Sequence, residues 1–249
     1  MIRLYSHILK KTFSILKLDP ILFVPSIVFY MVLSFNPIAG FLNENVIIMG
    51  IAQWLIPLVL IQPFIMLSAA QLIKNRKLKF NQVFARLSQL LIPTFLITAL
   101  HQPLYIFGAI KISLLNIDQL ETIESLPNDQ VSEIVVTVLI GLVIAVATTF
   151  VVPSIIDEKK KRQPLISQII ESIQLFLRFK WVALGVLITY FLTFFSLKII
   201  LLNLLLPILP QTLSMLFLHA ITGMERAIYF VFIYRLFLYI KPMANLSDN

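Results

Sequence analysis

The sequence contains no cysteine and is poor in charged residues and glycine. Without cysteine the chain has no disulfides, iron–sulfur clusters, thiolate nucleophiles or cysteine-ligated zinc. Charged residues make up 13% and hydrophobic residues 59% of the 249 positions. A soluble domain is about 25% charged and about 45–50% apolar. Too little polar surface exists to cover a water-soluble particle, so we expect lipid to be the solvent for much of the chain.

Motifs that carry catalysis are also missing. The sequence has no H-E-x-x-H zinc pair, no G-x-S-x-G nucleophile turn and no glycine-rich phosphate loop. The run DEKKKRQP at 157–164 is rich in charge, but such a run at a helix end is typical of a solvated loop. We therefore expect a protein that is not an enzyme and that holds no cofactor and no metal.

Long apolar runs predict an all-α polytopic membrane protein. Each pass takes roughly 20 residues, so about six passes fit the length. The runs are Pro20–Phe35, Val46–Ile73, Leu90–Ser113, Val135–Ile156 and Trp181–Ile240. The last is too long for one helix, and Pro207 and Pro210 predict a hairpin turn within it. The first run lacks a small-residue cleavage site and is expected to remain as a span. One domain, 1–249, is expected, with a short polar tail at 242–249.

Basic residues lie almost entirely in alternate loops, and the opposite loops are acidic. The positive-inside rule then places both termini in the cytoplasm. The basic residues predicted to contact anionic phospholipid headgroups are Lys10, Lys11, Lys74, Arg76, Lys77, Lys159, Lys160, Lys161 and Arg162. A net charge of +8 also suits nucleic acid, but these residues lie in short segments next to spans, so we expect no nucleic-acid partner.

Three stretches before the odd-numbered spans share one hydrophobic pattern. Apolar or small residues recur at relative positions 0, 1, 4, 7 and 8 from Ile8, from Val83 and from Ile169. These positions share one face of a helix, which predicts three amphipathic helices lying in the headgroup layer. The chain would then consist of three hairpins entered through cytoplasmic elbows, with repeat units 1–73, 74–156 and 157–241. A general need for interfacial anchors explains the same pattern without a true repeat.

Ionisable residues at membrane depth are the candidates for a functional site, because burying them in lipid is unfavourable. The candidates for a site are His101, His219, Glu225 and Arg226, and Lys198 lies near the outer end of the span before the last one. Glu225 and Arg226 are adjacent and point roughly 100° apart on a helix, so one should reach another helix. One hypothesis is a polar site in the bundle centre. The alternatives are a structural interhelical pair, or a break at Gly223 that leaves these charges in water.

Three stretches carry a resemblance to a known family. They are LIPTFLITALHQ at 91–102, VVPSIIDEK at 151–159 with the amphipathic segment after it, and YRLFLYI at 234–240. Together with the layout of spans, they make the chain resemble the YciC-like group of uncharacterised bacterial inner-membrane proteins. The layout is also similar to the membrane part of some glycerophosphodiester phosphodiesterases, whose catalytic domain is absent here. The resemblance implies an inner-membrane or envelope role.

Two functions remain open at this point. The first is a non-enzymatic integral membrane protein with a supporting or interaction role. The second is a protein that binds or transports a lipid or small amphiphile at a polar site in the bundle. A dry bundle with a paired Glu225 favours the first, and a polar cavity that reaches a leaflet favours the second.

Overall fold

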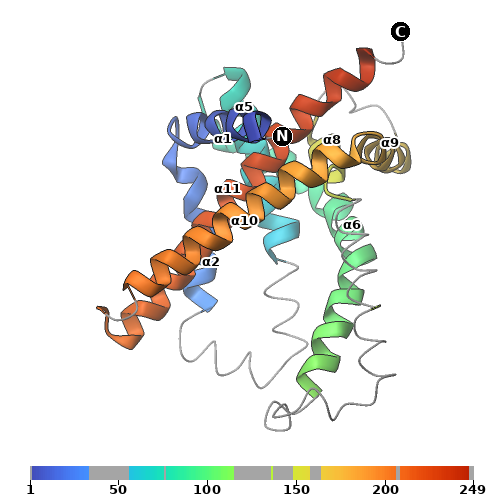
Figure 1. The fold of residues 1–249 in the computed structure, drawn as a ribbon. Coiled ribbons are helices and arrows are strands. Elements are labelled where there is room, and N and C mark those ends of the chain that lie inside the picture. Colours follow the sequence, from blue (N-terminus) through green and yellow to red (C-terminus); the bar gives the residue numbers. More distant parts are fainter. Residues whose placement is uncertain are drawn as a thin grey trace.

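In the computed structural model, described residues are 2–33, 56–75, 77–114, 136, 148–157, 164–205 and 208–246, with the backbone alone for 100–114, 205, 211, 212, 215 and 244–246. All secondary structure in these ranges is helical, as the sequence predicts. The elements are α1 Ile2–Leu16, η1 Pro20–Phe23, α2 Val24–Leu33, η3 Pro57–Ile61, α5 Gln62–Asn75, α6 Phe80–Leu114, α8 Val151–Ile156, α9 Leu165–Arg178, α10 Lys180–Leu205 and α11 Gln211–Leu246. Figure 1 shows their arrangement.

Among the described residues, four helical segments are long and apolar enough to cross a membrane, so the chain is a membrane protein. They are Pro57–Asn75, Phe80–Ala99, Lys180–Leu204 and Leu216–Met243. A bent pair of helices, Ile2–Leu16 with Pro20–Val32, brings the number to five if the pair is one span. The predicted runs 46–73 and 135–156 lie partly outside the described residues.

The first predicted elbow is present between α1 and α2, which meet at an angle of 105°. Asp19 adopts an extended conformation, as residues before proline do, and so ends the helical path. Its side chain accepts a hydrogen bond of 3.1 Å from the backbone N–H of Ile21. Pro20 then occupies the first helical position, where its missing N–H is harmless. This short segment turns the chain from a transverse helix into a descending one (Figure 1).

The apolar face of α1 is covered by protein. Ile8, Thr12, Ile15 and Leu16, four of the five residues of its predicted apolar face, are buried. Tyr5 contacts Phe232 of α11, with ring centroids 5.9 Å apart. The helix therefore packs across the bundle, and its lysines point outward.

The second stretch forms no elbow, contrary to the prediction. Residues 83–91 continue without a break into α6, which runs for 35 residues. Its buried residues Val83, Leu90 and Ile97 recur every seven residues, together with Thr94. One stripe therefore packs against α5 and η3 along the helix, and no residue between the amphipathic part and the span interrupts it.

The third stretch forms α9, and its predicted apolar face is divided between protein and the surface. Phe176 of that face is buried and Ile169 packs against the core, whereas Ile170 is 49% and Leu177 is 53% exposed. Gln168 and Ser172, outside that face, are buried as well. The first stretch thus packs its apolar face on protein, whereas the third leaves much of this face open. Figure 1 shows α9 nearly end-on and α10 running across the view, so the chain turns between them.

The centre of the fold is the crossing of α11 with α2. Gly223 is buried there, and a Cβ at this position would lie 2.6 Å from the Ile27 Cα. Only glycine permits this close approach of the two backbones, as in other tightly packed membrane helices. α11 continues straight through Gly223, so the alternative in which Gly223 breaks the helix is wrong. The helix also continues to Leu246, into the predicted tail.

A polar side chain contacts a backbone carbonyl that proline leaves without its usual N–H donor. Pro63 has no N–H to donate to the carbonyl of Val59, four residues earlier. The hydroxyl of Thr94 on α6 lies 3.4 Å from this carbonyl and 2.7 Å from its own helix's Leu90 carbonyl. In lipid such a substitute is needed, because water is absent. The contact joins α6 to the short helical segment η3.

The predicted final hairpin is present. α10 ends at Leu205 and α11 begins at Gln211, directly after Pro210, while Pro207 lies outside the described residues. The two helices lie side by side in Figure 1. α10 is exposed and apolar on most of its circumference, and Trp181, Phe195 and Leu204 are all more than 60% exposed. A helix that is apolar all round and unburied by protein is typical of a lipid-facing span.

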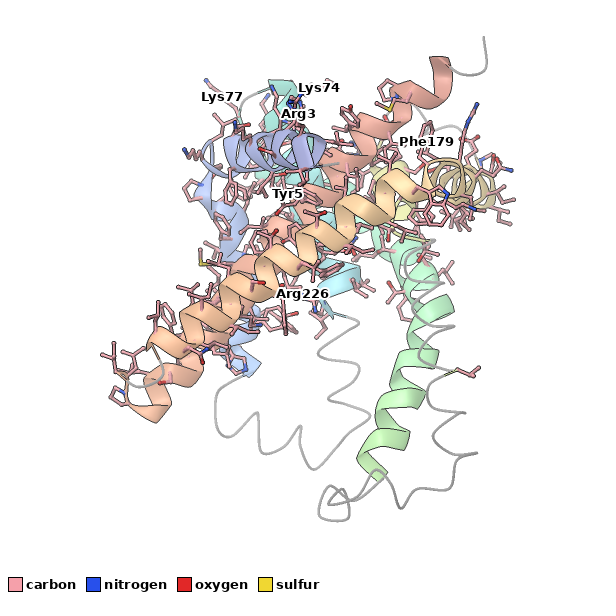
Figure 2. The ribbon with its side chains drawn as sticks, viewed as in Figure 1. Arg3, Tyr5, Lys74, Lys77, Phe179 and Arg226 are labelled. Atoms are coloured by element: carbon pink, nitrogen blue, oxygen red, sulfur yellow. The ribbon has the colours of Figure 1, made fainter. Side chains whose placement is uncertain are left out.

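One end of the molecule is basic. Arg3, Lys74 and Lys77 lie together there in Figure 2, on α1 and beside the end of α5. At the same end Lys241 of α11 makes an ion pair with Asp157, which follows α8. Arg86 of α6 donates a 2.9 Å hydrogen bond to the Ile156 carbonyl, at the C-terminal end of α8. Two cations thus join α6 and α11 to the buried helix α8.

Candidate functional site

A polar cluster within the described spans joins α10 to α11. The ammonium of Lys198 lies 3.6 Å from a carboxylate oxygen of Glu225, and about a quarter of each side chain is exposed. Lys198 also donates a 3.0 Å hydrogen bond to the hydroxyl of Thr222. That hydroxyl donates in turn to the Leu218 carbonyl at 2.9 Å. The ammonium of Lys198 therefore links the two helices through an ion pair and through a hydrogen bond to a hydroxyl.

An aromatic cluster packs beside this pair, on the side nearer the N-terminus of α10. Tyr190 is fully buried, and its hydroxyl donates a 3.1 Å hydrogen bond to the backbone carbonyl of Glu225. Its ring stacks on Phe194 at 4.4 Å and packs against Phe232 at 4.7 Å. The buried tyrosine has found a partner for its hydroxyl, and it fixes the register of the two helices at Glu225.

Arg226 turns away from the pair toward α2. Its guanidinium makes a side-chain hydrogen bond with Tyr30 of α2. Figure 2 places Arg226 near the middle of the molecule, on α11. Glu225 and Arg226 therefore serve different neighbours, as their angular separation on the helix requires.

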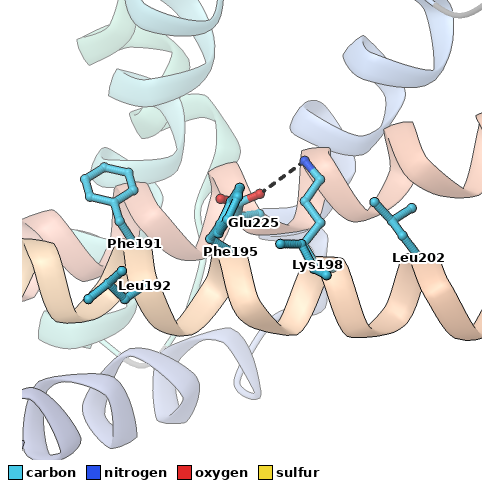
Figure 3. Close-up of a pocket in the computed structure, with 7 residues that line it drawn as sticks. Phe191, Leu192, Phe195, Lys198, Leu202 and Glu225 are labelled. Atoms are coloured by element: carbon cyan, nitrogen blue, oxygen red, sulfur yellow. Dashed lines mark ion pairs between the residues drawn. The ribbon is translucent and has the colours of Figure 1, made fainter.

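A groove of about 400 Å³ runs beside the ion pair. Figure 3 shows Lys198 and Glu225 between Phe191 and Leu192 on one side and Leu202 on the other. The lining residues are Phe191, Leu192, Phe195, Lys198, Ile199, Leu202 and Glu225. An apolar wall with a few polar groups is the usual composition of a site for small molecules, and this volume lies in the usual range of about 300–1,000 Å³.

The predicted central site is found only in part. Glu225 lies at the groove and Arg226 beside it, on the face toward α2. His219 lies on α11 nearer the hairpin turn and is partly exposed. The side chain of His101 lies outside the described residues, so its convergence with the others stays a prediction.

The predicted headgroup contacts lie at the basic end where they are described. Lys10 and Lys11 are exposed on α1, and Lys74 and Lys77 are exposed beside the end of α5. Arg76, Lys159, Lys160, Lys161 and Arg162 lie outside the described residues. Within the described ranges, no three His, Asp or Glu residues are grouped closely enough to hold a metal ion.

The sequence-based site omitted Lys198, Thr222, Tyr190 and Tyr30. Lys198 was visible as a charge near the outer end of a span. If the residues of α10 and α11 are paired by their distance from the hairpin turn, Lys198 lies opposite a residue of α11 that is closer to the turn than Glu225. Helical side chains tilt toward the N-terminus of their helix, however, and this direction carries the ammonium toward Glu225. The tilt rule was the signal that identifies this partner.

Comparison with protein families, with curated proteins and with solved structures finds no match to this chain. The class of the protein therefore rests on its own residues: a helical membrane protein with a Lys–Glu pair between two apolar helices, at a groove of about 400 Å³.

Proposed function

We propose that this chain is a non-enzymatic integral membrane protein with a supporting or interaction role in the bacterial cytoplasmic membrane. In this proposal six spans form three hairpins, and both termini are cytoplasmic. The basic cluster around Arg3, Lys74 and Lys77 supports this orientation, because basic residues collect on the cytoplasmic side. Membership of the YciC-like group is part of the same proposal and rests on the three quoted sequence stretches.

The observation that carries the role is the interhelical pair of Lys198 and Glu225. Intramembrane charges mark functional sites by default, yet here the carboxylate faces a lysine of the neighbouring helix. Tyr190 and Thr222 add hydrogen bonds at the same contact. These groups join α10 to α11, and such an arrangement is typical of a contact that stabilises a helix bundle rather than of a reaction centre.

Purification from native membranes tests the proposal. Mass spectrometry of the purified complex should identify partner proteins or retained lipids in fixed ratio to the chain. Single cysteines introduced at Lys11 and Ile208 should react with a membrane-impermeant thiol reagent from opposite sides of the membrane. The native chain has no cysteine, so each label reports one position. Labelling of both positions from the same side would contradict the topology.

The groove favours a second candidate function, the binding of a lipid or small amphiphile. Its apolar lining suits a hydrocarbon chain, and its Lys–Glu pair suits a polar headgroup. The two candidates make different predictions for lipid: binding at the groove requires retention of lipid that depends on Lys198. A support role alone requires no such dependence.

A further inference from the structure

The charged residues described at and beside the groove sum to one positive charge. Lys198 and Glu225 line the groove and pair with each other, and Arg226, the next residue of α11, lies beside it on the face toward α2. Arg226 contacts the neutral hydroxyl of Tyr30. Within the described residues this leaves one positive charge in excess at membrane depth, where an uncompensated charge is unfavourable. An anion at this place would neutralise it.

The ammonium of Lys198 is accessible to such an anion. Its distance of 3.6 Å to Glu225 is longer than the roughly 2.7–2.9 Å of a short charge-assisted hydrogen bond. About a quarter of the Lys198 side chain is exposed, and the residue lines the groove. The stem of a lysine is long and flexible, so the ammonium can contact both Glu225 and a ligand.

The wall of the groove excludes a free inorganic anion as the preferred ligand. Phe191, Phe195 and Leu202 line it, and both phenylalanines are about half or more exposed. Figure 3 shows these apolar side chains on both sides of Lys198 along α10. A small hydrated ion would lose its water on entering this apolar surface, whereas a lipid brings hydrocarbon that matches it.

We infer that the groove binds an anionic phospholipid, with its phosphate at Lys198 and an acyl chain along Phe191, Phe195 and Leu202. This inference rests on the second candidate function and names the charge class of its ligand. A zwitterionic phospholipid has the same hydrocarbon, but it carries no net charge to balance the excess. The site should therefore select phosphatidylglycerol over phosphatidylethanolamine.

The test uses the full chain in nanodiscs of phosphatidylcholine that contain equal minor fractions of phosphatidylglycerol and phosphatidylethanolamine. Native mass spectrometry measures the lipid retained per chain. The wild type should retain phosphatidylglycerol above its share of the nanodisc. Lys198→Gln should reduce retention to that share. Glu225→Gln removes the competing carboxylate and should increase retention above the wild type. The opposite signs separate ligand binding from simple damage to the fold.

Controls keep the result interpretable. Lys180→Gln changes a lysine about 27 Å away along the same helix, at 1.5 Å per residue, and should leave retention near the wild type. Lys198→Arg keeps the charge and should keep selective retention, so it carries the test if Lys198→Gln does not fold. Circular dichroism and a single gel-filtration peak establish folding for each variant.

Three outcomes overturn the inference. Selective retention of phosphatidylethanolamine that depends on Lys198 would leave amphiphile binding intact but contradict the anionic class. No selective retention of any lipid would remove both the class and the second candidate function. Displacement of phosphatidylglycerol by inorganic phosphate would show that the phosphate alone is recognised and that the apolar groove contributes nothing.

Discussion

Replacement of Gly223 by alanine tests the packing at the centre of the fold. The new Cβ would lie 2.6 Å from the Ile27 Cα and 2.8 Å from both the Ile27 nitrogen and the Ser26 carbonyl oxygen. Carbon atoms in contact normally lie about 3.5–4.0 Å apart, so α2 must move by about 0.9 Å or more. All three atoms belong to the backbone, so no side chain can rotate away to relieve the contact.

The expected loss combines two opposing effects. Overpacking costs about 1–3 kcal/mol, and a backbone obstacle places this site near the upper end of that range. Alanine is a better helix former than glycine by about 1 kcal/mol, which offsets part of the loss. We therefore expect Gly223→Ala to lower the free energy of unfolding by about 2 kcal/mol, and Gly223→Leu to lower it by more.

Unfolding in mixed detergent micelles, followed by circular dichroism, measures this difference. Met224→Ala is the matched control, because Met224 is the next residue of α11 and is 42% exposed. It should change the unfolding free energy far less than Gly223→Ala does. A Gly223→Ala protein as stable as the wild type, or more stable, would refute the close crossing of α2 and α11.

Three further predictions concern other contacts. Lys198→Met should destabilise the protein by about 1–3 kcal/mol by leaving Glu225 without its cation, and adding Glu225→Leu should restore most of that loss in the same unfolding assay. Thr94→Val should lower stability by about 0.6 kcal/mol, the average for a side-chain hydrogen bond within a membrane, and an unchanged stability would contradict its role beside η3. A fluorophore on Ile170→Cys of α9 should be quenched by lipid-borne nitroxide, whereas one on Gln174→Cys should be quenched by aqueous iodide; the reverse pattern would contradict the exposure of Ile170 to lipid.

Chain breaks and helix type were predictable because they depend on local chemistry. Proline removes a donor and fixes the backbone, so Pro207 and Pro210 predicted the hairpin turn correctly. The elbow before α2 depends on Asp19 and Pro20, and its place between an amphipathic helix and an apolar run was predicted as well. The same pattern failed before Leu90, where no cap or proline separates the two parts of α6.

The environment of each amphipathic face was not predictable from its periodicity. Periodicity defines which residues share a face, but the neighbour that covers that face comes from elsewhere in the chain. In α1 the apolar face meets α11, so Ile8 and Ile15 are buried in protein. In α9 the polar residues Gln168 and Ser172 are buried beside Phe176, and Ile170 remains exposed. Two helices with one pattern thus expose different parts of their apolar faces.

The candidate site was predictable for one partner and not for the other. The cost of a charge in lipid identified Glu225, and the adjacency of Arg226 required the two to diverge. Lys198 follows as the partner only when the position of the turn is combined with the tilt of helical side chains toward the N-terminus, and an apolar run alone specifies neither. Because Glu225 is held by α10 and Arg226 by α2, α11 is fixed to two neighbours through adjacent residues. A ligand that draws Lys198 away from Glu225 would therefore weaken the contact between α10 and α11. The contact between α11 and α2 would remain, because it depends on Gly223 and Arg226.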